Sequence, residues 1–164
     1  MEAKFKKLSQ DAILPEKATP LSIGYDLYVP TDFIVDKRRQ IIPLGLSIQL
    51  PAYIEAKIES RSGFSAKGIA GHKVLYGVGG EKTFIEVDSE YFDADVKTGK
   101  IDPDYRGEIG VIIHNHRPDI PFLIKKGTRI AQMTFYPTCE MEITEVDELS
   151  ETERGDGGFG HSGD

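Results

Sequence analysis

Apolar and polar residues alternate along much of this chain, a period of two that is typical of β-strands with one buried face. Residues 46–50 read Leu-Ser-Ile-Gln-Leu, residues 54–58 read Ile-Glu-Ala-Lys-Ile, and residues 143–146 repeat the alternation more weakly. Residues 109–113, and in part residues 129–135, are apolar enough to predict strands covered on both faces. No apolar stripe of helical spacing exceeds about two turns. The pattern therefore predicts an all-β protein.

Turn residues separate these runs at short intervals, as expected for many short strands. Strands at this spacing predict a β-sandwich, a jelly roll or a barrel. The length of 164 residues fits one domain with a single core. The turn signals lie at residues 30–32, 43–45, 51–52, 117–119, 126–127 and 137–138.

Two regions depart from the alternation. Residues 63–99 join strand-like segments through a long polar stretch, in which Lys82 to Val87 is predicted to form an extra hairpin strand. The tail from Leu149 to Asp164 is acidic and then rich in glycine, so it cannot pack a core by itself. We therefore expect a domain over residues 1–148 and a flexible tail over residues 149–164.

Charge and composition exclude several classes of function and location for this protein. The formal net charge of −7 argues against binding along a nucleic-acid backbone, although it is compatible with a single nucleotide. Cys139 is the one cysteine, which excludes an intrachain disulfide, and we expect it to be a small packed hydrophobe. No run approaches the roughly 18 apolar residues of a membrane span, and Met1 to Gln10 lacks the apolar stretch of a signal peptide. These features predict a soluble intracellular protein.

Four polar clusters interrupt the strand pattern, and each also has a plain structural explanation. Asp26 sits inside a strand-like run, where it either pairs with a cation or faces water. Residues 60–63, Ser-Arg-Ser-Gly, combine a planar guanidinium with a hydroxyl and a glycine, which suits phosphate oxygens but also fits an ordinary polar turn. Residues 101–108 place two carboxylates beside a tyrosine, either around a general base or in a simple Pro-Asp turn. Residues 154–163 could cradle phosphates or form a disordered tail.

The four histidines lack the spacing of a zinc site. Only His114 and His116 are close, where they share one face of a strand, and no cysteine or carboxylate beside them completes a ligand set. The sequence does not indicate a Ser-His-Asp catalytic triad either. The sequence therefore predicts no metal centre built from histidines.

Taken together and in order, the clusters resemble the five motifs of the trimeric dUTPase family. The resemblance covers most of the chain outside its middle segment, and its departures are small. Ser60 stands where many members have proline, and His161 stands where the family usually has serine after the glycine. The motifs correspond to residues 18–27, 60–63, 99–108, 127–132 and 154–160.

The resemblance implies a jelly-roll (β-clip-like) protomer in a homotrimer, with active sites between subunits and a C-terminal arm that closes over a neighbour's site. It implies hydrolysis of dUTP to dUMP and pyrophosphate, with Asp102 as the general base that activates water. Asp26 would organise a Mg²⁺ ion indirectly, through water. The residues implied to bind substrate are Arg61, Ser62, Gly63, Gly99, Ile101, Tyr105, Gln132, Arg154, Phe159, Gly160 and Ser162.

The middle segment is longer than in a typical family member by roughly twenty residues. Insertions of this kind usually lie on the protein surface. We assign the insert to about residues 78–95, which mix aromatic and acidic residues. The segment resembles the extra segment of some phage dUTPases, so a phage origin, in the cytoplasm of a bacterial host, is expected. The insert is either a decorative hairpin or a surface for a repressor-type protein partner. Two other functions remain open: a dCTP deaminase, and a non-catalytic nucleotide-sensing regulator.

Overall fold

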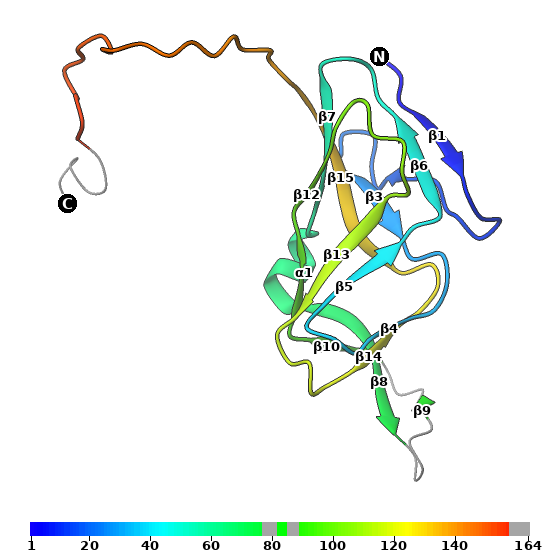
Figure 1. Ribbon diagram of the computed structural model, residues 1–164. Coiled ribbons are helices and arrows are strands. Elements are labelled where there is room, and N and C mark those ends of the chain that lie inside the picture. Colours follow the sequence, from blue (N-terminus) through cyan, green and yellow to red (C-terminus); the bar gives the residue numbers. More distant parts are fainter. Residues whose placement is uncertain (77–81, 85–88, 158–164) are drawn as a thin grey trace.

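The computed structural model describes residues 1–76, 82–84 and 89–157 of the protein (Figure 1). Within these ranges the chain forms β-strands and one short helix, α1 (Ser62–Lys67). The all-β prediction is confirmed. No helix in the described ranges is long and apolar enough to cross a membrane.

One five-stranded antiparallel sheet, with the order β12-β7-β15-β3-β2, carries most of the polar clusters. The alternation at residues 54–58 does form a strand, with Ala56 and Ile58 facing the core. The strands are β2 (Glu16–Lys17), β3 (Tyr25–Tyr28), β7 (Ile54–Glu59), β12 (Gly99–Ile101) and β15 (Arg129–Pro137).

A second sheet has the order β10-β8-β14-β4, with β9 paired to the far end of β8. This hairpin projects from the body of the molecule (Figure 1). The extra strand predicted from Lys82 is confirmed over residues 82–84, and residues 85–87 of that prediction lie outside the described ranges. The strands are β4 (Phe33–Val35), β8 (Ile69–Tyr76), β9 (Lys82–Phe84), β10 (Glu90–Phe92) and β14 (Phe122–Ile124).

The remaining strands form a three-stranded sheet, β11-β13-β5, and a two-stranded sheet, β1-β6. The prediction that residues 109–113 are covered on both faces is wrong for β13: Val111 and Ile113 are buried, while Ile112 is half-buried. An antiparallel sheet can leave one face outward, and β13 does so. The strands are β1 (Lys4–Lys7), β5 (Arg39–Pro43), β6 (Leu46–Gln49), β11 (Ala94–Lys97) and β13 (Gly110–Asn115).

One hydrophobic cluster joins the sheets into a single core. Leu27 of β3, Ile42 of β5 and Ile48 of β6 all belong to it, each at most 2% exposed. The rings of Phe92 and Phe122 stack within it, with centroids 4.4 Å apart and an angle of 8° between planes. This packing connects the sheet that carries the polar clusters to the rest of the fold.

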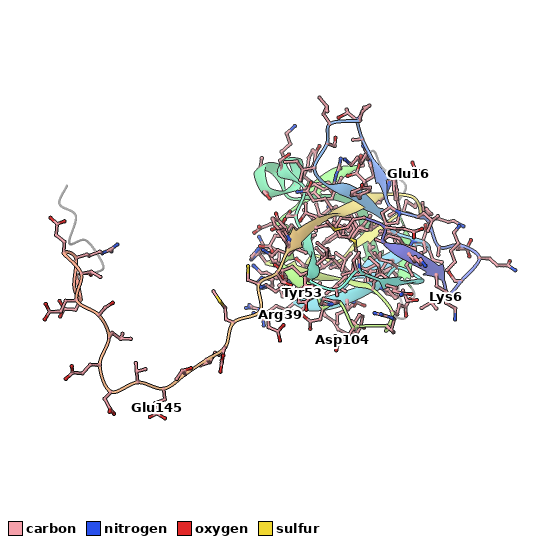
Figure 2. The ribbon with its side chains drawn as sticks, turned by 90° about the horizontal axis from the view of Figure 1, so that it is seen from above. Lys6, Glu16, Arg39, Tyr53, Asp104 and Glu145 are labelled. Carbon is pink, nitrogen blue, oxygen red and sulfur yellow. The ribbon has the colours of Figure 1, made fainter. Side chains whose placement is uncertain are left out.

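Regular structure ends at Pro137, and residues 139–156 are exposed. They run away from the body, with Glu145 far along the tail (Figure 2). The weak strand predicted at residues 143–146 is therefore absent, because a strand needs a neighbour to accept its backbone hydrogen bonds. The expectation that Cys139 is packed is also wrong, since it is exposed just beyond β15.

Gly68 fixes the turn from α1 into β8. Its φ of 88° and ψ of −177° lie in a region essentially restricted to glycine. A Cβ atom at this position would come within 2.1 Å of the backbone oxygen of Phe92. Both the conformation and the close approach therefore demand glycine, and together they set where α1 lies.

We expect Gly68→Ala to lower the free energy of unfolding by about 3 kcal/mol or more, the sum of a strained backbone and an unrelieved clash. Gly127→Ala is the matched control, because Gly127 also has a positive φ, of 80°, but has nothing within 4 Å of an added Cβ. The control should lose only about 1–2 kcal/mol. Urea unfolding at one fixed protein concentration measures both, and equal losses would contradict the role of the Phe92 contact.

Candidate functional site

A polar cleft of about 710 Å³ lies where β3, β7 and β15 meet the start of α1. Its volume is in the range of ligand pockets. It brings together five of the predicted site residues, which come from three separate motifs of the sequence. The lining residues are Ala18, Ser22, Ile23, Gly24, Asp26, Glu59, Arg61, Ser62, Gly63, Gln132, Thr134 and Tyr136.

Strand register explains why these motifs converge. Gln132 of β15 is the Cα partner of Asp26 on one side and of Glu59 on the other. The three residues thus form one row across adjacent strands, with neighbours about 5 Å apart. A bulge in β15 between Arg129 and Ala131 sets this register.

The carboxylate of Asp26 lies between two arginines. Its Oδ1 accepts a hydrogen bond from Nε of Arg61 at 2.9 Å, and its Oδ2 accepts one from Nη1 of Arg129 at 3.3 Å. Asp26 is only 6% exposed, whereas both arginine side chains reach solvent. Of the two alternatives left by the sequence, Asp26 therefore pairs with cations, and it holds Arg61 at the cleft.

The start of α1 presents the second motif to the cleft. Arg61 is the residue before the helix, and its carbonyl accepts hydrogen bonds from the N–H groups of Phe64 and Ser65. The Arg61 guanidinium also lies over the Phe64 ring, 5.7 Å from its centroid. Ser62 and Gly63 follow in the exposed first turn, and an added Cβ at Gly63 would meet nothing within 4 Å. The turn is therefore open to a ligand.

Gln132 packs tightly against the first motif. Its Nε2 donates to the carbonyl of Ser60 at 3.4 Å. A Cβ atom on Gly24 would come within 2.8 Å of its Oε1. The glycine at position 24 thus leaves room for the glutamine side chain beside Asp26.

The turn that carries Asp102 lies elsewhere on the protomer. Asp102 follows β12, whose last residue, Ile101, pairs with Ala56 near the start of β7, whereas Arg61 lies beyond the other end of β7. Six residue steps of strand separate the two positions, roughly 20 Å. Neither Asp102 nor Tyr105 lines the cleft of its own chain. One protomer therefore does not bring its Asp102 to its own Arg61.

The Asp102 turn is held by its own hydrogen bonds. The N–H of Tyr105 donates to the carbonyl of Asp102 at 3.1 Å, and the Tyr105 hydroxyl donates to the carbonyl of Glu108 at 3.0 Å. Arg106 donates to the carbonyls of Pro103 and Tyr105. Asp102 and Tyr105 themselves are exposed, so the turn presents a carboxylate and an aromatic ring to whatever approaches it.

The other predicted site residues are placed as follows. Gly99 and Ile101 are the ends of β12, next to the Asp102 turn. Arg154 is exposed in the tail, where its Nε donates to the carbonyl of Gly157 at 2.7 Å. Phe159, Gly160 and Ser162 lie outside the described ranges, as does His161.

Sequence reasoning missed two features. Arg129 stands in the fourth motif, but only the pairing of β15 with β3 shows that it reaches Asp26. Asp95 likewise lies directly opposite His114 in the strand register, and it supplies the carboxylate that seemed to be missing beside the two histidines. Neither neighbour could be found from spacing along the chain, because both arise from pairing between distant strands.

A second hollow, of about 470 Å³, lies at the ends of β1, β3 and β15. Its walls are mostly apolar and include Phe5, Leu50 and Phe135. None of the described residues that line it is an arginine or a lysine that could bind an anion. The polar cleft is therefore the better candidate for a site that binds a phosphorylated ligand.

Comparison with known proteins gives concordant matches. The family model described as dUTPase matches residues 10–78 and 92–163. The chain is 41% identical over 161 residues to the deoxyuridine 5'-triphosphate nucleotidohydrolase of Arabidopsis thaliana, an alignment that covers 98% of this chain and 82% of that protein. It is 38% identical to the protein of the same description from Nautilia profundicola, with 99% of each covered.

Among solved structures, the dUTPase of Staphylococcus bacteriophage 80alpha with dUPNHPP superposes with a TM-score of 0.77 at 25% identity, and the match covers 99% of this chain and 98% of that one. The similar structures thus include a phage protein, while the sequence relatives named above are cellular. The phage origin stays a prediction.

We expect Asp26→Asn to lower the free energy of unfolding by about 2 kcal/mol or more, because it leaves two arginines without their buried countercharge. Asp119→Asn is the control, since the Arg117–Asp119 pair is exposed on both sides and its loss should change the free energy of unfolding much less. Chemical unfolding of both variants provides the measurement. A loss from Asp26→Asn no larger than that of the control would show that the cluster is not held by this carboxylate.

Proposed function

The chain belongs to the dUTPase family, and we propose that it hydrolyses dUTP to dUMP and pyrophosphate at a site built around its polar cleft. The observation that carries the proposal is the cleft itself. It gathers Arg61, Ser62, Gly63 and Gln132 beside a buried carboxylate that fixes the arginine in place. This arrangement suits the binding of a polyphosphate.

The phosphate chain would lie against Arg61, Ser62 and Gln132. A guanidinium offers planar donors that match phosphate oxygens, and the hydroxyl and amide add further donors. Because Asp26 already orients Arg61 through its Nε, the terminal nitrogens remain available to the ligand. Because Arg61 is already fixed, little conformational entropy is lost when the ligand binds, and this favours affinity.

The nucleoside and the attacking water would meet the turn after β12. Backbone groups from Gly99 to Ile101 would read the uracil edge, and Tyr105 would pack under the deoxyribose, where a 2′-hydroxyl would clash. This turn lies roughly 20 Å along the sheet from Arg61 of the same chain. We therefore propose that the turn of one protomer completes the cleft of another in a homotrimer.

In the reaction, Asp102 acts as the general base. Its exposed carboxylate accepts a proton from water as the water oxygen bonds to the α-phosphorus. The bond from that phosphorus to the bridging oxygen breaks, and pyrophosphate leaves with the electron pair. Alignment of the phosphate chain by Arg61, Ser62 and Gln132 supplies most of the acceleration, through positioning and through stabilisation of charge.

Mg²⁺ fits this site as a companion of the phosphates. A carboxylate has about four lone-pair positions, and the arginines occupy two of those on Asp26. The others can accept hydrogen bonds from water bound to the ion, which matches the preference of Mg²⁺ to keep its waters. The ion would neutralise phosphate charge, while Asp26 orients its water shell and holds Arg61.

The tail would cover the occupied site. Arg154 would reach the γ-phosphate, Phe159 would stack on the uracil, and Gly160 and Ser162 would contribute phosphate contacts. What supports a docked tail is its composition, since it carries large apolar side chains that a free protomer leaves exposed. These are Met141, Ile143, Val146 and Leu149.

A second role is proposed for the middle segment, as a surface for a repressor-type protein partner. The match to the family is interrupted over residues 79–91, inside the assigned insert. At the end of this gap Tyr91 is 55% exposed, with the ammonium of Lys67 lying 5.6 Å from the centroid of its ring. Much of the insert lies outside the described ranges, so this role rests on the composition of the segment and on Tyr91.

We expect Asp102→Asn to lower kcat by about 10²–10⁴-fold while leaving the affinity for a non-hydrolysable dUTP analogue nearly unchanged, because the amide keeps the shape but cannot accept the proton. Asp104→Asn is the matched control, an exposed carboxylate two residues away in the same turn, and should keep its activity. Pyrophosphate release and calorimetric titration measure the two effects.

The same assay separates the competing activities. Ammonia released from dCTP, without pyrophosphate from dUTP, would indicate a deaminase. Unchanged turnover in Asp102→Asn would remove the proposed base. Absence of turnover with tight nucleotide binding in the unaltered protein would favour a nucleotide-sensing regulator.

Sharing of the site between subunits predicts complementation. Asp102→Asn and Arg61→Ala proteins should each be inactive as homotrimers, yet a co-expressed mixture should recover about a quarter of the sites, those with Asp102 from one chain and Arg61 from the other. Pyrophosphate release by the mixture, compared with the sum of the separate variants, provides the test. Activity equal to that sum would contradict a shared site.

A further inference from the structure

Three potential metal ligands meet on the outward face of the β11–β13 pair, and none of them lines the polar cleft. Asp95 of β11 and His114 of β13 are Cα partners. His116 lies two residues beyond His114, and its N–H donates to the carbonyl of Asp93, which continues the pairing past the end of β13. One ligand atom from each of the three residues lies within 4.8 Å of the other two.

The backbone fixes this arrangement. Asn115, between the two histidines, is 1% exposed, and its Oδ1 accepts a hydrogen bond from the N–H of Arg117 at 2.9 Å. Both imidazoles therefore stand on the outward face, with ring centroids 4.4 Å apart. Nε2 of His116 lies 3.1 Å from Oδ2 of Asp95. The three side chains converge without any movement of the strands.

Two polar atoms of this cluster are buried yet unpaired. In the part of the chain that the structure describes, Oδ1 of Asp95 and Nδ1 of His114 have no hydrogen-bond partner. Such atoms are rare in folded proteins because they lose water without compensation. Both atoms belong to the same cluster, where one bound ligand would engage both residues. The cluster offers one carboxylate and two imidazole rings, and an imidazole binds a metal through an unprotonated nitrogen.

We propose that Asp95, His114 and His116 bind a divalent transition-metal ion of the Zn²⁺ class, with water completing the coordination. Two imidazoles and one carboxylate are donors typical of Zn²⁺, Co²⁺ or Ni²⁺, whereas Mg²⁺ prefers oxygen ligands alone. Donor atoms around tetrahedral Zn²⁺ are about 3.3 Å apart. The His116 side chain is partly exposed, which leaves it room to turn toward that separation.

Lys97 is the competitor of the metal. Its ammonium lies 3.0 Å from Oδ2 of Asp95, in a pair whose side chains are 46% and 32% exposed. Partly exposed pairs of this kind are weak, so a divalent ion can displace the ammonium into solvent. The ion would then cross-link β11 to β13, a role independent of the proposed hydrolysis of dUTP.

Titration of the full-length protein with Co²⁺, followed by visible absorption at fixed pH with excess Mg²⁺ and no nucleotide, tests the site. The unaltered protein and the control His72→Gln, which lacks a histidine outside the cluster, should bind one Co²⁺ per chain. The double variant His114→Ala/His116→Ala should bind more than about 100-fold more weakly, since even outer-shell changes cost up to that much.

A gain of affinity separates the proposal from simple loss of folding. Lys97→Met removes the competing ammonium, so it should bind Co²⁺ several-fold more tightly than the unaltered protein. Affinity unchanged in the double variant would overturn the proposal, and so would binding by Lys97→Met that is no tighter. Activity toward dUTP does not enter either measurement.

Discussion

The ion-pair cluster of Asp26 with Arg61 and Arg129 is the interaction on which the cleft depends. It joins three elements, β3, β15 and the start of α1, through one nearly buried carboxylate. Without that negative charge, the two guanidinium groups would repel one another beside the cleft. With it, the pair leaves one net positive charge, held in a fixed position. The same residue thus serves the packing of the sheet and the chemistry of the cleft.

Strand β7 organises the rest of the site. Its first residues pair with β12, which leads into the Asp102 turn, while its last residues lead into Arg61 and α1. A single straight element therefore separates the proposed base from the phosphate-binding residues of its own chain. This separation supports the proposal that one protomer completes the cleft of another.

The pattern of apolar and polar residues predicted the strands and the polar clusters. The contacts between side chains of different strands depend on strand pairing, which the pattern does not give. The alternation at residues 54–58 was sufficient to predict β7, and the order of the clusters was sufficient to indicate the family. The partners of Asp26 could not be predicted, because they depend on the register and on a bulge in β15. Asp95 was missed beside His114 for the same reason. Cys139 was predicted to be packed and residues 143–146 to form a strand, but no strand among the residues that the structure describes pairs with them.

The position of β7 also constrains how the chain can change in length during evolution. A deletion or insertion of one residue inside it would reverse which side chains face the core and would shift Arg61 relative to the turn at Asp102. The constraint on length does not apply to the hairpin of β8 and β9, because this hairpin projects from the body of the molecule (Figure 1). The match to the family is interrupted over residues 79–91, which lie outside β7 and so outside the segment to which this constraint applies.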